Sequence, residues 1–112
     1  MKQDIVFLKH IQESIAAILQ FTEGVSLLEF QDNRLIRDAT IRNFEIIGEA
    51  SKNISLDTRH KYPDIPFRNM AGMRDKLIHH YFGVDIPAVW EVVEKILPDL
   101  KIRLEEVIKL EA

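Results

Sequence analysis

Apolar residues recur at helical spacing in the first half of the chain. From Asp4 to about Phe21 they return every three or four residues, which is the pattern of one buried helical face. A second stripe begins after Asp32 or Asn33, either of which is a favourable helix cap, and ends near Asn53. The two stripes consist of Ile5, Leu8, Ile11, Ile15, Ile18 and Leu19, and of Ile36, Ala39, Thr40, Ile47, Ala50 and Ile54. The pattern therefore predicts two long helices here.

Turn and cap signals mark short elements beside these helices. Gly24 suits the position just past the end of the first helix, and the run Ser-Leu-Leu-Glu at 26–29 has the form of a capping box that opens a short helix. Residues 55–58 offer another N-terminal cap for a short helical turn. Pro63 and Pro66 then favour an extended connection.

Two further main helices are predicted in the second half of the chain. Residues 66–81 contain no long alternating run of β-branched residues, and Gly83 follows them as a stop signal. Asp85, with Pro87 in the first turn, starts the last helix. Pro98 removes a backbone donor and clashes with the preceding turn, so we expect a kink or a break there. The apolar stripe of this last helix is Val89, Val93, Ile96, Leu97, Leu100, Leu104 and Ile108.

About four main amphipathic helices in a chain of 112 residues predict an all-α helical bundle that forms a single domain over residues 1–112. No repeat, low-complexity stretch or linker interrupts the pattern. The interior of such a bundle is small, and a second copy would cover the exposed apolar remainder most simply. We therefore expect a homodimer.

Composition limits the compartment and the partners. The chain has no cysteine, which excludes disulfides and thiolate metal sites and makes the cytoplasm the expected location. Charged and polar residues interrupt the first apolar stretch, so neither a signal peptide nor a membrane span is predicted. The net charge of −3 weakly disfavours a nucleic-acid partner, but residues 34–76 hold nine basic and six acidic side chains. A functional basic patch and chance unevenness explain this distribution equally well.

Residues with reactive side chains gather near the end of the helix predicted over 66–81. Arg74, His79, His80 and Tyr81 place a permanent cation, two imidazoles and a phenol within eight positions. A guanidinium holds a phosphate and offsets charge on its oxygens, while an imidazole moves a proton to or from a hydroxyl. RNA supplies its own nucleophile in the 2′-hydroxyl, so such a pair suits RNA cleavage without a metal.

No metal site and no cofactor site are expected. The sequence lacks a Gly-rich phosphate loop, a metal-ligand histidine pair with a carboxylate between, and a hydrolase nucleophile motif. His10 and His60 lie far from the cluster in sequence, and the adjacent His79 and His80 would point in different directions from a helix.

Helical geometry raises a question about Arg74 and His79. At about 100° per residue, Tyr81 returns to the face of Arg74 after seven steps, whereas His79 lies about 140° away. One regular helix would not aim both side chains at one small target. Either the helix end loosens near Gly83, or a two-fold interface brings Arg74 and His79 of both copies around one cleft. Spacing alone also leaves a purely structural role open, because Arg and His favour helix C-termini.

The pattern Arg74-x4-His79-x-Tyr81 resembles the signature of HepT toxins in the HEPN superfamily. The similarity extends over residues 73–85, and residues 37–39 and 42–50 resemble the family's third helix. Both segments occur in the family's order in a chain of this length, and the resemblance covers nearly the whole chain.

The resemblance implies a dimerising helical bundle that acts as a metal-independent endoribonuclease, with two Arg-His pairs lining one cleft. Arg74 would bind and stabilise the scissile phosphate, and His79 would act as general acid or base. Asp75 matches the polar position after the arginine and would orient its neighbours. His80 would either share the proton transfer or face solvent, and we favour the second interpretation.

The resemblance also implies control by a partner in a type VII toxin–antitoxin system. An MntA-like nucleotidyltransferase antitoxin would transfer AMP from ATP onto Tyr81, and the bulky, negatively charged group would block the cleft and repel RNA. Two other interpretations are a non-catalytic helical subunit that helps a nucleotidyltransferase hold a nucleotide, and a plain dimerising bundle. The presence of both Arg74 and His79 favours the nuclease.

Overall fold

The computed structural model describes residues 2–80 and 83–112, and these residues form helices and turns with no strand. The helices are α1 (Lys2–Phe21), α2 (Leu27–Asp32), α3 (Arg34–Lys52), α4 (Leu56–Lys61), α5 (Phe67–His79), α6 (Ile86–Lys95) and α7 (Leu97–Glu111). The all-α prediction is confirmed. Among the described residues, no helix is both long enough and apolar enough to cross a membrane.

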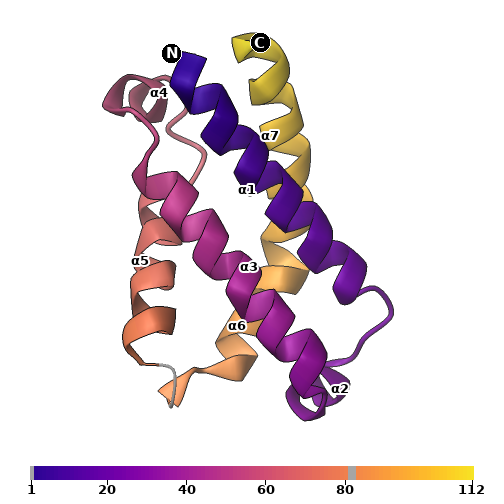
Figure 1. Cartoon of the computed structure of the whole chain (residues 1–112). Helices are drawn as coiled ribbons and strands as arrows, with labels where there is room; N and C mark the ends of the chain where they lie inside the picture. The colour runs from indigo at the N-terminus through magenta and orange to yellow at the C-terminus, as the bar shows by residue number, and fades with distance from the viewer. Residues whose placement is uncertain (1, 81–82) are drawn as a thin grey trace.

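Helix α3 lies in the middle of the bundle. It packs against α1 on one side and α5 on the other, while α7 runs beside α1, so that the start of α1 lies near the end of α7 (Figure 1). Helices α2 and α6 contact each other at the far end of the molecule. The predicted apolar stripes supply most of the core, including the fully buried residues Leu8, Ile11, Ile15, Ile18, Ile47, Leu97 and Leu104.

The predicted local signals form as expected. Gly24 has a φ of 71°, a left-handed conformation that favours glycine after a helix. The Ser26 hydroxyl accepts a hydrogen bond from the Glu29 backbone N–H at 3.2 Å, as a helix cap should. The cap of α3 is Asn33, whose side-chain oxygen accepts from the Ile36 N–H at 3.1 Å. These caps satisfy backbone donors that the helices themselves leave unpaired.

Two helix ends differ in detail from the prediction. The expected last helix is broken at Ile96 into α6 and α7. Pro98 follows two residues later, in the first turn of α7. A helix leaves the backbone N–H groups of its first turn unpaired, so the missing N–H of Pro98 costs nothing there. The helix predicted over 66–81 is α5, and it ends at His79 because His80 has φ −128° and ψ 38°. The predicted interruption near Pro98 is confirmed. The prediction that the other helix continues past His79 is wrong, because His80 is not helical.

A buried carboxylate ties α1 to the start of α4. Asp4 is only 3% exposed, and its oxygens accept hydrogen bonds from the Ser55 N–H at 3.0 Å, the Ser55 hydroxyl at 2.6 Å and the Thr58 hydroxyl at 2.6 Å. Burial on its own would raise the pKa of Asp4, but these hydrogen bonds outweigh it and hold the pKa below its ordinary value. The ionised form is therefore favoured by folding.

Replacing Asp4 with asparagine should destabilise the fold by about 1–3 kcal/mol at neutral pH, because hydrogen bonds to a charged acceptor are lost. Since the folded pKa is lower than the unfolded one, the advantage of Asp4 is complete above the unfolded value near 3.8 and is lost as the pH falls through the folded value. Denaturant unfolding at pH 7 and at pH 3 measures this. Glu13→Gln, the same change at an exposed position of α1, is the control. An equal Asp4→Asn effect at both pH values would contradict the prediction.

Candidate functional site

Arg74 lies at a point where α5 packs tightly against α3. The backbone of Gly48 in α3 faces this point, and a Cβ atom placed there would lie 2.0 Å from the Cβ of Arg74 and 2.7 Å from the carbonyl oxygen of Met70. No larger residue fits without moving α5, because real Cβ atoms do not approach other atoms so closely. Gly48 therefore fixes the base of the Arg74 side chain against α3.

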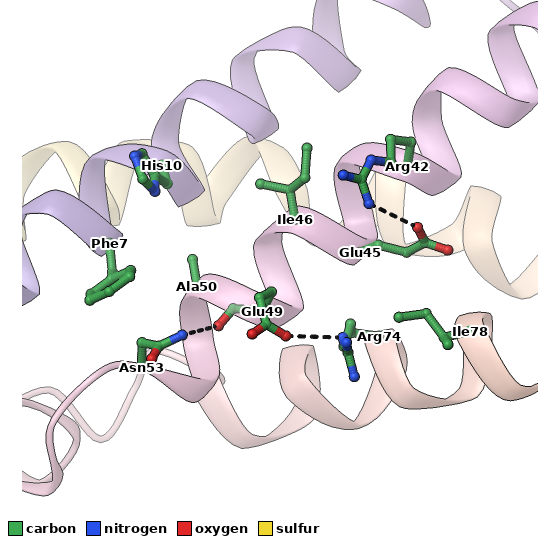
Figure 2. A pocket seen from close by; sticks show the side chains of 10 residues that line it. All are labelled: Phe7, His10, Arg42, Glu45, Ile46, Glu49, Ala50, Asn53, Arg74 and Ile78. Atoms are coloured by element: carbon green, nitrogen blue, oxygen red, sulfur yellow. Dashed lines mark hydrogen bonds and ion pairs between the residues drawn. The ribbon is translucent and has the colours of Figure 1, made fainter.

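Two carboxylates hold the guanidinium of Arg74. Its Nε lies 3.2 Å from the Glu49 carboxylate on α3, and its Nη1 lies 3.0 Å from Oδ1 of Asp75 (Figure 2 shows the Glu49 pair). The Arg74 side chain is 25% exposed, so it is partly desolvated while remaining accessible at one edge. Partial desolvation strengthens the Coulombic attraction between this cation and its carboxylate partners.

Asp75 links Arg74 to a second cation. Its Oδ1 lies 2.5 Å from the ammonium of Lys52 on α3. The hydrogen bond from Lys52, followed by that from Arg74, lowers the pKa of Asp75, so the carboxylate is ionised near neutral pH. Asp75 thus contacts both Arg74 and Lys52, and the orienting role that the family resemblance implies for it stays a prediction.

A groove opens beside Arg74 across three helices, with a cavity volume of about 220 Å³. Helix α3 forms its floor, and α1 and α5 form its sides (Figure 2). We call it the Arg74 groove; it is lined by Phe7, His10, Arg42, Glu45, Ile46, Glu49, Ala50, Asn53, Arg74 and Ile78. In residues 2–80 and 83–112, no three metal-ligating side chains gather into a cluster.

His79 does not face the Arg74 groove. It is the exposed last residue of α5, and the groove lining does not include it. The backbone is helical from Arg74 through His79 and leaves the helical conformation only at His80. A loosened helix end, one of the two arrangements that the sequence left open, therefore does not turn His79 toward Arg74 within a single chain.

The other two residues of the motif region are placed differently. His80 is exposed and lines a separate, wider cavity of about 950 Å³ between α5 and α6, away from Arg74. Tyr81 lies outside the described residues. The predicted return of Tyr81 to the face of Arg74 assumed that His80 is helical. The backbone of His80 is not helical, so helical spacing no longer supports that prediction.

His10 is a groove residue that sequence reasoning set aside. It lies on α1, and its ring packs edge-on against Phe7 with the ring centroids 6.2 Å apart. The two residues are three positions apart and so share one face of α1, beside the buried stripe that includes Leu8 and Ile11. The packing of α1 on α3 brings this face to the groove beside Arg74, a proximity that separation in sequence does not reveal.

Comparison with known proteins gives consistent matches. A family model described as "Ribonuclease HepT-like" matches residues 11–107. The chain is 49% identical over 109 residues to a Methanocaldococcus jannaschii protein named as an RNase, covering 96% of this chain and 90% of that protein.

Relatives from other organisms have similar names. The chain is 46% identical over 103 residues to a Thermococcus cleftensis protein named as a ribonuclease HepT, covering 92% of this chain and 94% of that protein. It is 37% identical over 111 residues to a Caldanaerobacter subterraneus protein named as an RNase, covering 99% of both. No solved structure matches the chain significantly.

Proposed function

The chain belongs to the HepT-like ribonuclease family, and from this membership we propose that it cleaves RNA internally, without a metal, using Arg74 and His79. The structural observation that carries the proposal is the position of Arg74. It is a partly desolvated cation, fixed at the Gly48 contact and accessible at the edge of a groove. Such a group binds a phosphate and stabilises the charge that develops on it.

The reaction follows from the chemistry of RNA. The 2′-oxygen attacks the adjacent phosphorus as its proton moves to a general base, and the bond from phosphorus to the 5′-oxygen breaks as that oxygen receives a proton. The products are a 2′,3′-cyclic phosphate and a 5′-hydroxyl. His79 serves as acid or base in this scheme, and Arg74 holds the non-bridging phosphate oxygens. Because RNA carries its own nucleophile, the step needs no metal-bound water.

A second copy would complete this site. His79 is exposed and outside the Arg74 groove of its own chain, so a two-fold dimer supplies the most direct way to bring an Arg74 and a His79 to one phosphate. Exposed apolar side chains are available for such contacts on several elements. They include Leu28, Leu35, Leu56, Ile78, Ile102 and Leu110.

Incubation of the purified chain with a single-stranded RNA tests the activity. We expect internal cleavage that leaves 2′,3′-cyclic phosphate ends, at a rate that a chelator does not change. The same sequence made with 2′-O-methyl sugars should remain intact, because its nucleophile is blocked. Intact RNA, or cleavage that strictly requires a divalent cation, would contradict the mechanism.

Control of the enzyme by AMP transfer is also part of the proposal, and the motif resemblance supports it. With an MntA-like nucleotidyltransferase and ATP, we expect AMP on the phenol of Tyr81 and loss of RNA cleavage. The chain has two tyrosines. Tyr81→Phe should prevent modification, whereas Tyr62→Phe is the matched control, because Tyr62 is only 4% exposed and its hydroxyl donates to Glu111.

Mass spectrometry of the intact protein and its peptides measures this modification. AMP found on another residue, or full inhibition of Tyr81→Phe without any modification, would instead show that the partner inhibits by covering the site.

A further inference from the structure

We propose that the Arg74 groove binds one nucleobase of the RNA, next to the phosphate that Arg74 holds. The proposal rests on the proposed ribonuclease function and adds a base-binding site to it. Its new participants are Phe7 and His10, which precede the residues 11–107 that the family model matches.

The size and walls of the groove suit a single ring system. Its volume of about 220 Å³ lies below the range of roughly 300–1,000 Å³ that is typical of sites for drug-sized ligands. Phe7, Ile46, Ala50 and Ile78 give it apolar walls, and its polar groups come from all three helices. A flat ring with polar edges matches this combination of surfaces.

The charges of the groove favour a base over a phosphate in its interior. Arg42 lies 3.5 Å from the Glu45 carboxylate, and Arg74 is paired with Glu49. The two cations and two anions balance, so an entering phosphate would meet two carboxylates as well as two guanidiniums. A neutral base gains from both kinds of group, because its N–H groups donate to carboxylates and its ring nitrogens and carbonyls accept from guanidiniums.

Phe7 and His10 supply ring surfaces beside this polar floor. The Phe7 ring is half-buried and His10 is exposed, and their edge-on contact presents two rings on the same side of the groove (Figure 2). Bases of single-stranded RNA stack on such rings, and loss of one stacking partner weakens affinity by about 5-fold to 150-fold, equivalent to roughly 1–3 kcal/mol.

The test uses the full chain and compares Phe7→Leu and His10→Ala with matched controls outside the groove. Phe21→Leu makes the same change at the other end of α1, and His60→Ala removes an exposed imidazole from α4. Binding of a 2′-O-methyl oligoribonucleotide is measured by fluorescence anisotropy, and kcat and KM are measured on cleavable RNA. We expect both groove variants to weaken binding and raise KM by about 5-fold or more with kcat little changed, and both controls to match the parent chain.

Phe7→Tyr keeps the ring and should bind RNA like the parent, which separates loss of stacking from loss of folding. Unchanged binding by Phe7→Leu and His10→Ala would overturn the proposal. So would a change in sedimentation of these variants at equal helical content, because it would assign the groove to a contact between copies. If the parent chain fails to cleave RNA, the ribonuclease proposal fails separately, and the oligonucleotide binding still decides whether the groove holds a base.

Discussion

Arg74→Ala should lower kcat/KM for RNA cleavage by about 10²–10³, because removal of one fixed donor to developing charge has an effect of this size. His79→Ala should lower it by about 10²–10⁴, the usual contribution of a general acid or base. Both variants should fold like the parent, since His79 is exposed and the Arg74 ion pairs lie at the surface of the bundle. Growth arrest on expression without a partner should disappear in both.

Neighbouring residues provide matched controls. Arg68→Ala removes an exposed arginine from the same helix, outside the Arg74 groove. His80→Ala removes the adjacent imidazole, which lines the other cavity and should be a bystander. Equal toxicity of the Arg74 and His79 variants and the parent would refute the assignment, and a loss in His80→Ala as large as that in His79→Ala would transfer the proton-transfer role to His80.

Mixed dimers of the two inactive variants test whether the site is shared. A dimer of Arg74→Ala with His79→Ala retains one Arg74 and one His79, on different copies. If the reacting pair forms across the interface, the mixture should recover part of the parent activity; if the pair lies within one chain, it should recover none. Sedimentation should report about twice the chain mass of 13.1 kDa, and an active monomer would rule out the shared site.

Gly48→Ala should destabilise the fold by about 1–3 kcal/mol, the usual cost of forcing extra atoms into a packed contact. The added methyl group would lie 2.7 Å from a backbone oxygen of α5, so the helix rather than a flexible side-chain end must move. Because the same methyl group lies 2.0 Å from the Cβ of Arg74, cleavage activity should fall at temperatures where the variant is still folded. Chemical denaturation and RNA cleavage at low temperature measure the two effects.

Gly72→Ala is the control for this change. Gly72 is also helical, but a Cβ there meets nothing within 4 Å. Alanine should therefore stabilise α5 by up to about 1 kcal/mol through its higher helix propensity. Equal stability and activity of Gly48→Ala and Gly72→Ala would show that the Gly48 contact does not determine the position of Arg74.

Local signals in the sequence account well for the helices and poorly for the site. Helix caps and breaks depend on residues close in sequence, so they could be predicted directly. Examples are the caps at Ser26 and Asn33 and the break near Pro98. The Arg74 groove depends on α1 and α5 packing on opposite sides of α3, which periodicity does not specify. The place of His10 in the groove could not be predicted for that reason.

Gly48 is a feature of the sequence that points to this packing. A glycine in the middle of a predicted helix costs about 1 kcal/mol relative to alanine, so its presence indicates a close approach of another element. The sequence shows the glycine but does not identify α5 as the approaching helix.

If Arg74 holds the scissile phosphate as we propose, its two ion pairs divide its binding energy between the ground state and the transition state. Because Glu49 and Asp75 already neutralise the guanidinium, a singly charged phosphodiester only exchanges one set of anionic partners for another, with little net gain. As the 2′-oxygen attacks, negative charge accumulates on the phosphorane oxygens, and they become stronger competitors for the same N–H groups. Interactions that strengthen only at that stage accelerate the chemical step without tightening substrate binding. In the proposed mechanism, the acidic neighbours of Arg74 would thus favour turnover over retention of uncleaved RNA.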